Sequence, residues 1–237
     1  ARMQALSAGA DDFLSKPLDD LTLLARLRSL LRARETADEL RMRDTICREL
    51  GFADMAEGFA VPGLIGIVSA STDSNETWRS QLLPHVGDHL VTLTRADALA
   101  DGHGPVPDVF LIAADLFSPG EGLRLMSELR SRPATRHSAI CLILPRGARE
   151  TAAMALDLGA NDLVPDTVDP QECALRLSTL MRRKRQSDLL RATLRDGLRL
   201  SVTDPLTGLY NRRYALPHLD RMAARARDTG RAFAVML

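Results

Sequence analysis

Two stretches of the sequence share a frame but differ at the residues that could bind or stabilise a charged group. Residues 9–19 read GADDFLSKPLD, and residues 159–169 read GANDLVPDTVD. The first stretch holds Lys16 and Pro17 at the place where the second holds Asp166 and a threonine. Lys16 is the only basic residue in either stretch. The chain therefore repeats a packing pattern while keeping the positively charged group in one copy alone.

The match between the two copies extends beyond these stretches, which indicates an internal repeat. Aligning Gly9 with Gly159 places identical residues opposite each other on both sides. In each copy the pattern predicts the end of a helix, a glycine turn, a short strand, a loop and an amphipathic helix. The further identities pair Ala5-Leu6 with Ala155-Leu156, Arg26-Leu27 with Arg176-Leu177, Leu30 with Leu180, and Arg32 with Arg182.

The second copy is complete, because a series of alternating strands and helices precedes it. Each of five apolar segments is predicted to be a strand, and each is followed by a segment with helical spacing. Such alternation implies right-handed crossovers and a parallel sheet covered on both faces. We expect a flavodoxin-like, doubly wound, five-stranded parallel α/β domain over residues 63–183, with any ligand at the carboxyl ends of its strands. The predicted strands are residues 64–70, 88–94, 107–114, 139–144 and 162–166.

Composition places the chain among ordinary globular proteins. Of its 237 residues 45% are hydrophobic and 26% are charged, and the formal net charge is zero, which argues against a general polyanion or DNA binder. The basic run at residues 182–185 is interpreted as a solvated helix face, because no helix-turn-helix accompanies it. The three cysteines lack metal-binding spacing and fit a reducing cytoplasm. No apolar run approaches the roughly 20 residues that span a bilayer, so we expect no membrane partner.

Two motifs resemble those of a known family. The segment PDVFLI, within the third predicted strand, and GADDFLSKP at residues 9–17 resemble the receiver domain of bacterial response regulators. The resemblance implies a phosphoryl-accepting aspartate at the end of strand three and an acidic pair after strand one that holds Mg²⁺. It further implies a Ser or Thr ending strand four and a Lys ending strand five, and metal and lysine would neutralise the transferred phosphoryl group. Residues 1–33 resemble the end of such a receiver, with Lys16 and Pro17 as its phosphate-sensing pair and a histidine kinase as its partner.

In the complete copy, each of these places is altered. Six residues along from Pro107, the phosphoacceptor place holds Ala113, and Asp115 follows two residues later. An inward lysine without an acidic cluster would be an unpaired charge, so its loss follows from the loss of the chemistry. We expect residues 63–183 to be a degenerate, unphosphorylated adaptor receiver; the alternative is a different reaction at Asp115 or Asp166. The other altered places hold Ser69-Ala70-Ser71, Leu144-Pro145 and Asp166-Thr167.

Long helices and a partial further domain are predicted to flank this receiver. Residues 34–62 are expected to continue a helix and then form a loop, and residues 184–203 to form a signalling stalk helix. The following stretch, DPLTGLYNRRY, closely resembles the opening of GGDEF domains, the diguanylate cyclases, so residues 204–237 would begin such a domain and AFAVML would be its first strand. Asn211 can cap a new helix. The resemblance implies structural roles for the matched residues Asp204, Leu206, Thr207, Gly208, Leu209, Asn211, Arg212 and Arg213.

Receiver, degenerate receiver, stalk and GGDEF opening follow one another as in PleD-type response regulators. The resemblance implies a cytoplasmic diguanylate cyclase, in which phosphorylation of the first receiver drives formation of a homodimer. Two cyclase domains would then join two GTP molecules into cyclic di-GMP with Mg²⁺, and a product built from two half-sites makes dimerisation a natural switch. For this chain itself we predict no catalytic residue, metal site or cofactor, because the metal-binding and GGDEF residues of that family follow the first strand. The alternative is a receiver-based interaction scaffold whose GGDEF domain is catalytically degenerate.

Overall fold

The chain divides into two compact units. One unit holds the described residues from 62 to 187, and the other holds those from 188 to 235. Where positions between 23 and 42 are described they are helical, as predicted, whereas Lys16 and Pro17 lie outside the described residues. The computed structural model describes residues 62–100, 104–202, 204, 207 and 209–235 and scattered positions between 23 and 42, with side chains except at 193–202.

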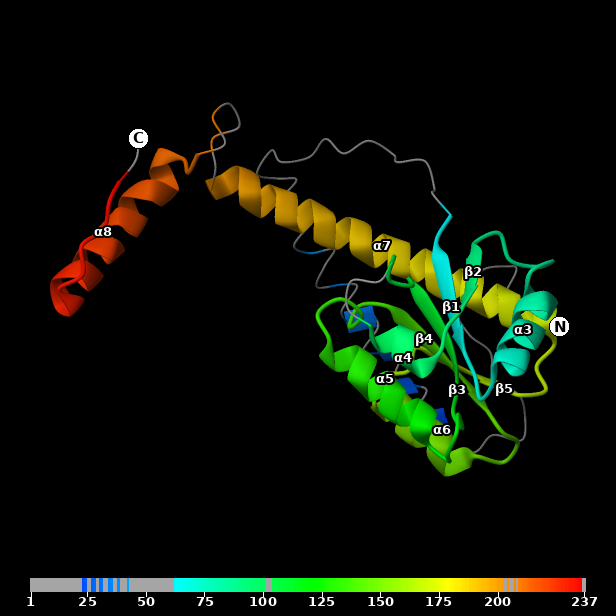
Figure 1. Cartoon of the computed structure of the whole chain (residues 1–237). Helices are drawn as coiled ribbons and strands as arrows, with labels where there is room; N and C mark the ends of the chain where they lie inside the picture. Colours follow the sequence, from blue (N-terminus) through cyan, green and yellow to red (C-terminus); the bar gives the residue numbers. More distant parts are fainter. Residues whose placement is uncertain are drawn as a thin grey trace. The chain divides into compact units, whose positions relative to one another are not determined.

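A five-stranded, fully parallel sheet forms the centre of the first unit. Its strands lie in the order β2-β1-β3-β4-β5, so the chain moves from the middle to one side and then crosses back to the other (Figure 1). This order is the doubly wound, flavodoxin-like arrangement, which confirms the predicted fold class. The strands are β1 Leu64–Val68, β2 His89–Thr92, β3 Val109–Ala113, β4 Ala139–Leu144 and β5 Asp162–Pro165.

Helices follow the strands and begin or end at residues suited to those positions. The Ser71 side chain accepts a hydrogen bond from the Ser74 amide at the start of α3, as an N-cap should. Gly159 ends the segment after α6 with a φ of 103°, a conformation that favours glycine. The helices are α3 Thr72–Leu82, α4 Arg95–Leu99, α5 Glu121–Ser131, α6 Arg149–Asp157, α7 Pro170–Val202 and α8 Arg212–Thr229.

Two hydrophobic cores cover the two faces of the sheet. On one face, α4, α5 and α6 pack on alternate strand residues such as Phe110 and Ile112. On the other face, α3 and the first part of α7 pack on the intervening residues, among them Ile67 and Leu111. Burial of each large apolar side chain contributes roughly 1.5–3 kcal/mol. The intact cores explain why the apolar strand pattern survives without a phosphorylation site.

The second unit contains the end of α7 and the segment around α8. Helix α8 begins after Asn211, whose side chain accepts a hydrogen bond from the Tyr214 amide at 3.0 Å, so the predicted cap is confirmed. The prediction that AFAVML forms a strand is wrong for its described residues 232–235, which form no strand. A strand needs a neighbour for its backbone hydrogen bonds, and the described part of the chain offers none at this segment.

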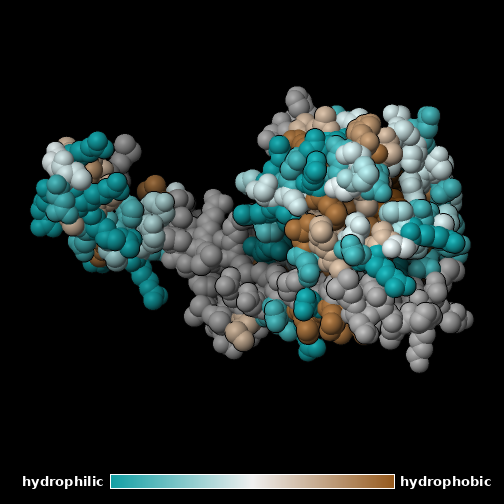
Figure 2. Space-filling view, turned by 90° about the horizontal axis from the view of Figure 1, so that it is seen from below, coloured by the Kyte–Doolittle hydropathy of each residue, from teal (hydrophilic) through white to brown (hydrophobic). Residues whose placement is uncertain are grey.

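Among the described residues, no helix combines the length and the apolar character needed to cross a bilayer. Figure 2 shows a largely hydrophilic surface interrupted by apolar patches. Exposed apolar side chains of the sheet domain include Phe117 and Met154, which are 79% and 55% exposed.

Candidate functional site at the two ends of the sheet

At the carboxyl end of β1, a neutral hydrogen-bonded pair occupies the place where an acidic pair would bind metal. The Ser69 hydroxyl donates to the side-chain oxygen of Asn75 over 2.8 Å, and both residues are buried. The Asn75 amide nitrogen in turn donates to the Leu93 carbonyl. These groups satisfy one another and join β1, α3 and the end of β2. Neutral donors and acceptors of this kind do not form the oxygen-rich anionic site that Mg²⁺ prefers.

At the carboxyl end of β3, the start of α5 packs directly on the predicted phosphoacceptor place. The Gly122 amide donates to the Ala114 carbonyl at 2.9 Å. A Cβ atom at Gly122 would lie 2.0 Å from the Ala113 carbonyl oxygen, so this position needs glycine. Asp115 is exposed, and its carboxylate accepts a hydrogen bond from the Gly120 amide at 2.8 Å. Asp115 therefore accepts a hydrogen bond that fixes its loop, and the methyl group of Ala113, two residues earlier, cannot take a phosphoryl group.

The carboxyl ends of β4 and β5 likewise lack the predicted chemistry. Leu144 is buried at the end of β4, while Asp166 and Thr167 are exposed after β5. The Arg146 guanidinium reaches Thr167 with an Nε to Oγ1 distance of 3.4 Å. Within the described part of the chain, no group of three or more His, Cys, Asp or Glu side chains could hold a metal ion. The residues at this end of the domain do not fit Mg²⁺ with a phosphorylated aspartate.

The amino end of the same sheet carries ion pairs between strand-flanking aspartates and basic residues of α7. Asp88 precedes β2 and pairs with Arg185 of α7 at 2.6 Å. Asp108 precedes β3 and lies 3.9 Å from the ammonium of Lys184. The interpretation of residues 182–185 as a wholly solvated helix face is therefore wrong for these two residues. Their acidic partners lie far away in the sequence, so periodicity along the helix could not reveal them.

A second ion-pair cluster joins the amino end of β5 to α7. Arg176, 6% exposed, binds Asp162 at 2.8 Å and Glu172 at 3.4 Å. The neighbouring Cys173 is buried, and burial together with the Asp162 charge raises the pKa of its thiol to about 12. The thiol is therefore neutral and a poor nucleophile at ordinary pH. A sequence signal for this cluster existed, since Asp12 matches Asp162 in the repeat just as Arg26 matches Arg176.

Arg130 at the end of α5 closes the same end of the sheet. Its guanidinium donates to the carbonyl oxygens of Arg136, Ser138 and Gly159 and to the side chain of Asn161, at 2.6 to 3.0 Å. Burial lowers the pKa of Arg130 to about 10, which still leaves it protonated at neutral pH. Sequence analysis missed this residue, because its partners lie in loops whose spacing shows no pattern.

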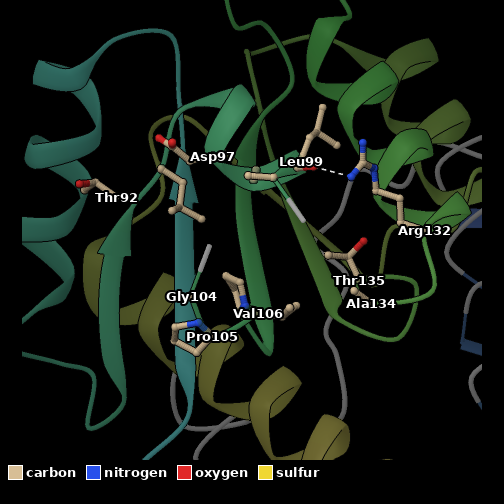
Figure 3. Close-up of a pocket in the computed structure, with 13 residues that line it drawn as sticks. Thr92, Asp97, Leu99, Gly104, Pro105, Val106, Arg132, Ala134 and Thr135 are labelled. Carbon is tan, nitrogen blue, oxygen red and sulfur yellow. Dashed lines mark hydrogen bonds between the residues drawn. The ribbon is translucent and has the colours of Figure 1, made fainter. Parts of the chain in front are cut away.

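The pocket in Figure 3 has a volume of about 340 Å³ and lies between α4, the segment before β3 and the end of α5. Its polar groups already have structural partners. Arg132 donates to the Leu99 carbonyl, and the Thr135 hydroxyl donates to the Leu129 carbonyl at 2.7 Å. Asp97 accepts from Thr94 at the start of α4, and these hydrogen bonds lower the pKa of its carboxyl. The polar side chains of Arg132, Thr135 and Asp97 in this pocket therefore make structural hydrogen bonds within the domain.

The segment that begins the predicted GGDEF domain is a turn followed by a helix. The Asp204 carboxylate accepts from the Thr207 amide at 2.9 Å and from its hydroxyl at 3.1 Å. The Asp204 amide donates to the Leu209 carbonyl at 2.7 Å, which closes the turn. Exposed Arg212 and Arg213 then begin α8. These contacts fix the turn, while the structural roles that the resemblance implies for the matched residues stay a prediction; Leu206 and Gly208 lie outside the described residues.

The strand order, the parallel pairing and the helices on both faces give the domain formed by the described residues 62–187 the flavodoxin-like fold, which is also the fold of receiver domains. The geometry of its carboxyl end defines a receiver without the acidic pair, the phosphoacceptor and the lysine.

The chain as a whole is similar to the response regulator PleD of Caulobacter vibrioides, which confirms the predicted resemblance. Identity is 38% over 228 residues in two strains, covering 95% of this chain and 49% of PleD. The chain thus spans about half the length of these curated relatives. Protein PetR of Rhodobacter capsulatus is also 38% identical, over 74 residues that cover 31% of this chain and 30% of PetR. No protein-family model matches the chain.

Solved structures similar to the chain include response regulator domains. A response regulator from Chloroflexus aurantiacus is 21% identical with a TM-score of 0.46, covering 52% of this chain and 99% of that one. A CheY-like receiver domain from Methanospirillum hungatei is 16% identical with a TM-score of 0.45, covering 53% and 98%.

Proposed function

We propose that this chain is the regulatory part of a response regulator whose longer form is a diguanylate cyclase controlled by phosphorylation. The observation that carries the proposal is the similarity to the response regulator PleD over 95% of the chain. That similarity extends across the receiver fold and into the stretch DPLTGLYNRRY, which resembles the opening of GGDEF domains. The longer protein would convert two GTP molecules into cyclic di-GMP in the cytoplasm.

The two receiver copies would have different tasks. Lys16 and Pro17, at the end of the first receiver, would contact the phosphoryl group delivered by a histidine kinase. The domain at 63–183 would act as an adaptor in a homodimer. The residues at the carboxyl end of the sheet support this division, because Ala113 offers no carboxylate and Ser69 and Asn75 form a neutral buried pair after β1.

The residues of this chain would hold and orient the start of the GGDEF domain, and they would not take part in catalysis. Mg²⁺ and GTP would bind to the rest of the GGDEF domain and supply the phosphoryl-transfer chemistry there. Asp204 and Asn211 would fix the turn between α7 and α8, which sets the start of that domain. We therefore expect purified material of these 237 residues to make no cyclic di-GMP.

The test uses the longer protein that contains this chain with a complete GGDEF domain. Incubated with GTP, Mg²⁺ and acetyl phosphate, it should form cyclic di-GMP, and light scattering should show a dimer. Lys16→Ala should remove the response to acetyl phosphate while leaving the basal rate, and Arg182→Ala, which removes one positive charge from an exposed position, serves as the control outside the first receiver. Nucleotide binding or dimerisation without any product would support the scaffold alternative and overturn the cyclase proposal.

A further inference from the structure

We propose that the amino end of the sheet contains a mechanical joint. Its contacts couple residue 63, where the chain enters the receiver domain, to residues 181–185 of α7, the helix along which the chain leaves. The coupling would pass through Asp88 and would not involve the degenerate carboxyl end. This inference goes beyond the proposed function and does not depend on cyclase activity.

The first observation is that one carboxylate oxygen binds both sides of the joint. The Oδ1 atom of Asp88 accepts the Gly63 amide at 2.9 Å and the Arg185 guanidinium at 2.6 Å. The Asp88 side chain is 13% exposed, so water screens this contact less than it would a surface pair. A displacement of Gly63 must therefore either move the carboxylate with it or break a charge-assisted hydrogen bond.

The second observation is a direct contact between the same two segments. A Cβ atom at Gly63 would lie 2.5 Å from the sulfur of Met181, and Met181 is 1% exposed. The residue just before β1 thus touches α7 itself, one turn before Arg185. Close-packed contacts transmit small displacements because no void absorbs them.

The third observation is a parallel connection at the next residue. The Leu64 amide donates to Oδ2 of Asp108 at 3.0 Å, and the other oxygen of Asp108 lies 3.9 Å from Lys184. Gly63, just before β1, and Leu64, its first residue, are therefore each joined through an aspartate to one of two successive basic residues of α7. Two such connections at neighbouring residues would fix both the position and the rotation of α7 at residues 184 and 185.

The experiment measures amide hydrogen exchange by NMR on the 237-residue chain, from both sides of the joint. Arg185→Gln leaves the Gly63 amide and its acceptor unchanged. It should nevertheless raise the exchange rate of that amide, on the order of fivefold, if Asp88 transmits the coupling. Arg182→Gln is the matched control, because it removes the same charge from an exposed position one turn earlier.

The reciprocal variants perturb the entering chain and read out the departing helix. Gly63→Ala should raise exchange along residues 185–192, whereas Asp115→Ala at the carboxyl end should leave those residues unchanged. Combining Asp88→Asn with Arg185→Gln should add little to either single change, because both break one connection. The proposal is overturned if Arg185→Gln and Arg182→Gln give the same exchange at Gly63, or if Gly63→Ala affects only residues around itself.

Discussion

The two ends of one parallel sheet differ in what holds them together. At the carboxyl end, where receivers carry out phosphoryl transfer, this domain has a Ser69–Asn75 pair, a methyl group at Ala113 and a backbone contact at Gly122. At the amino end, Asp88 and Asp162 bind arginines of α7. The difference teaches that the receiver fold can form without the acidic pair and the aspartate at the carboxyl end, because two apolar cores between the two ends hold the sheet and its helices together.

The largest expected effect concerns backbone packing at the carboxyl end. Gly122→Ala would place a Cβ atom 2.0 Å from the Ala113 carbonyl oxygen, and the resulting rearrangement should cost on the order of 4 kcal/mol of unfolding free energy. Urea unfolding followed by circular dichroism measures this. Gly87→Ala is the control, because nothing lies within 4 Å of its Cβ position. Equal stability of the two variants would show that the carboxyl end is loosely packed.

The next effect concerns the ion pairs at the amino end. Arg176→Met leaves Asp162 and Glu172 partly buried without their cation, which should lower the unfolding free energy by about 3 kcal/mol. The exposed Arg182→Met on the same helix should change it by less than about 0.5 kcal/mol. The denaturant midpoints of the two variants, compared at equal m-values, measure the two changes in unfolding free energy. A small effect of Arg176→Met would mean that packing alone holds β5 to α7.

A pH dependence should appear at the amino end through Cys173. Its folded pKa, about 12, lies above the ordinary value of 9.0, so the unfolded chain loses this proton first as pH rises. The associated stability is complete below pH 9.0 and is lost towards pH 12, with a slope of up to about 1.4 kcal/mol per pH unit. Thermal unfolding at several pH values should therefore show a steeper loss in the wild type than in Cys173→Ala. Parallel curves would contradict the buried, neutral thiol.

The smallest expected effect lies in the loop after β3. Asp115→Ala removes one exposed hydrogen bond to the Gly120 amide, so the unfolding free energy should fall by no more than about 1 kcal/mol. Equilibrium unfolding in urea measures the change, with Asp73→Ala in the exposed first turn of α3 as a comparison. A loss of several kcal/mol would assign Asp115 a structural role that its exposed contacts do not explain.

Patterns along the chain predicted the strands and the altered carboxyl end, because both depend on residues close in sequence. The apolar run at β4 and the position of Ala113 could be counted directly. The pairing of Asp88 with Arg185 could not, because 97 residues separate the two. The steric need for Gly122 was equally hidden, since it arises only when α5 approaches the end of β3.

The ion pair between Asp162 and Arg176 could have been predicted from the sequence. The repeat presents an aspartate and an arginine at the same separation in both copies, as Asp12 with Arg26 and Asp162 with Arg176. Recurrence of opposite charges in two copies indicates a contact rather than a solvated helix face. The prediction of a strand at 232–235 was wrong for another reason, because a strand depends on neighbours that its own sequence does not contain.

The most direct test of the central claim adds beryllofluoride and Mg²⁺ to the 237-residue chain and follows amide chemical shifts by NMR. The account predicts no change around Ser69, Ala113 and Asp166, because this end of the domain has neither acceptor nor metal site. Acetyl phosphate should likewise leave the domain unlabelled. Chemical-shift changes centred on Asp115, or stoichiometric labelling of that residue, would contradict the account.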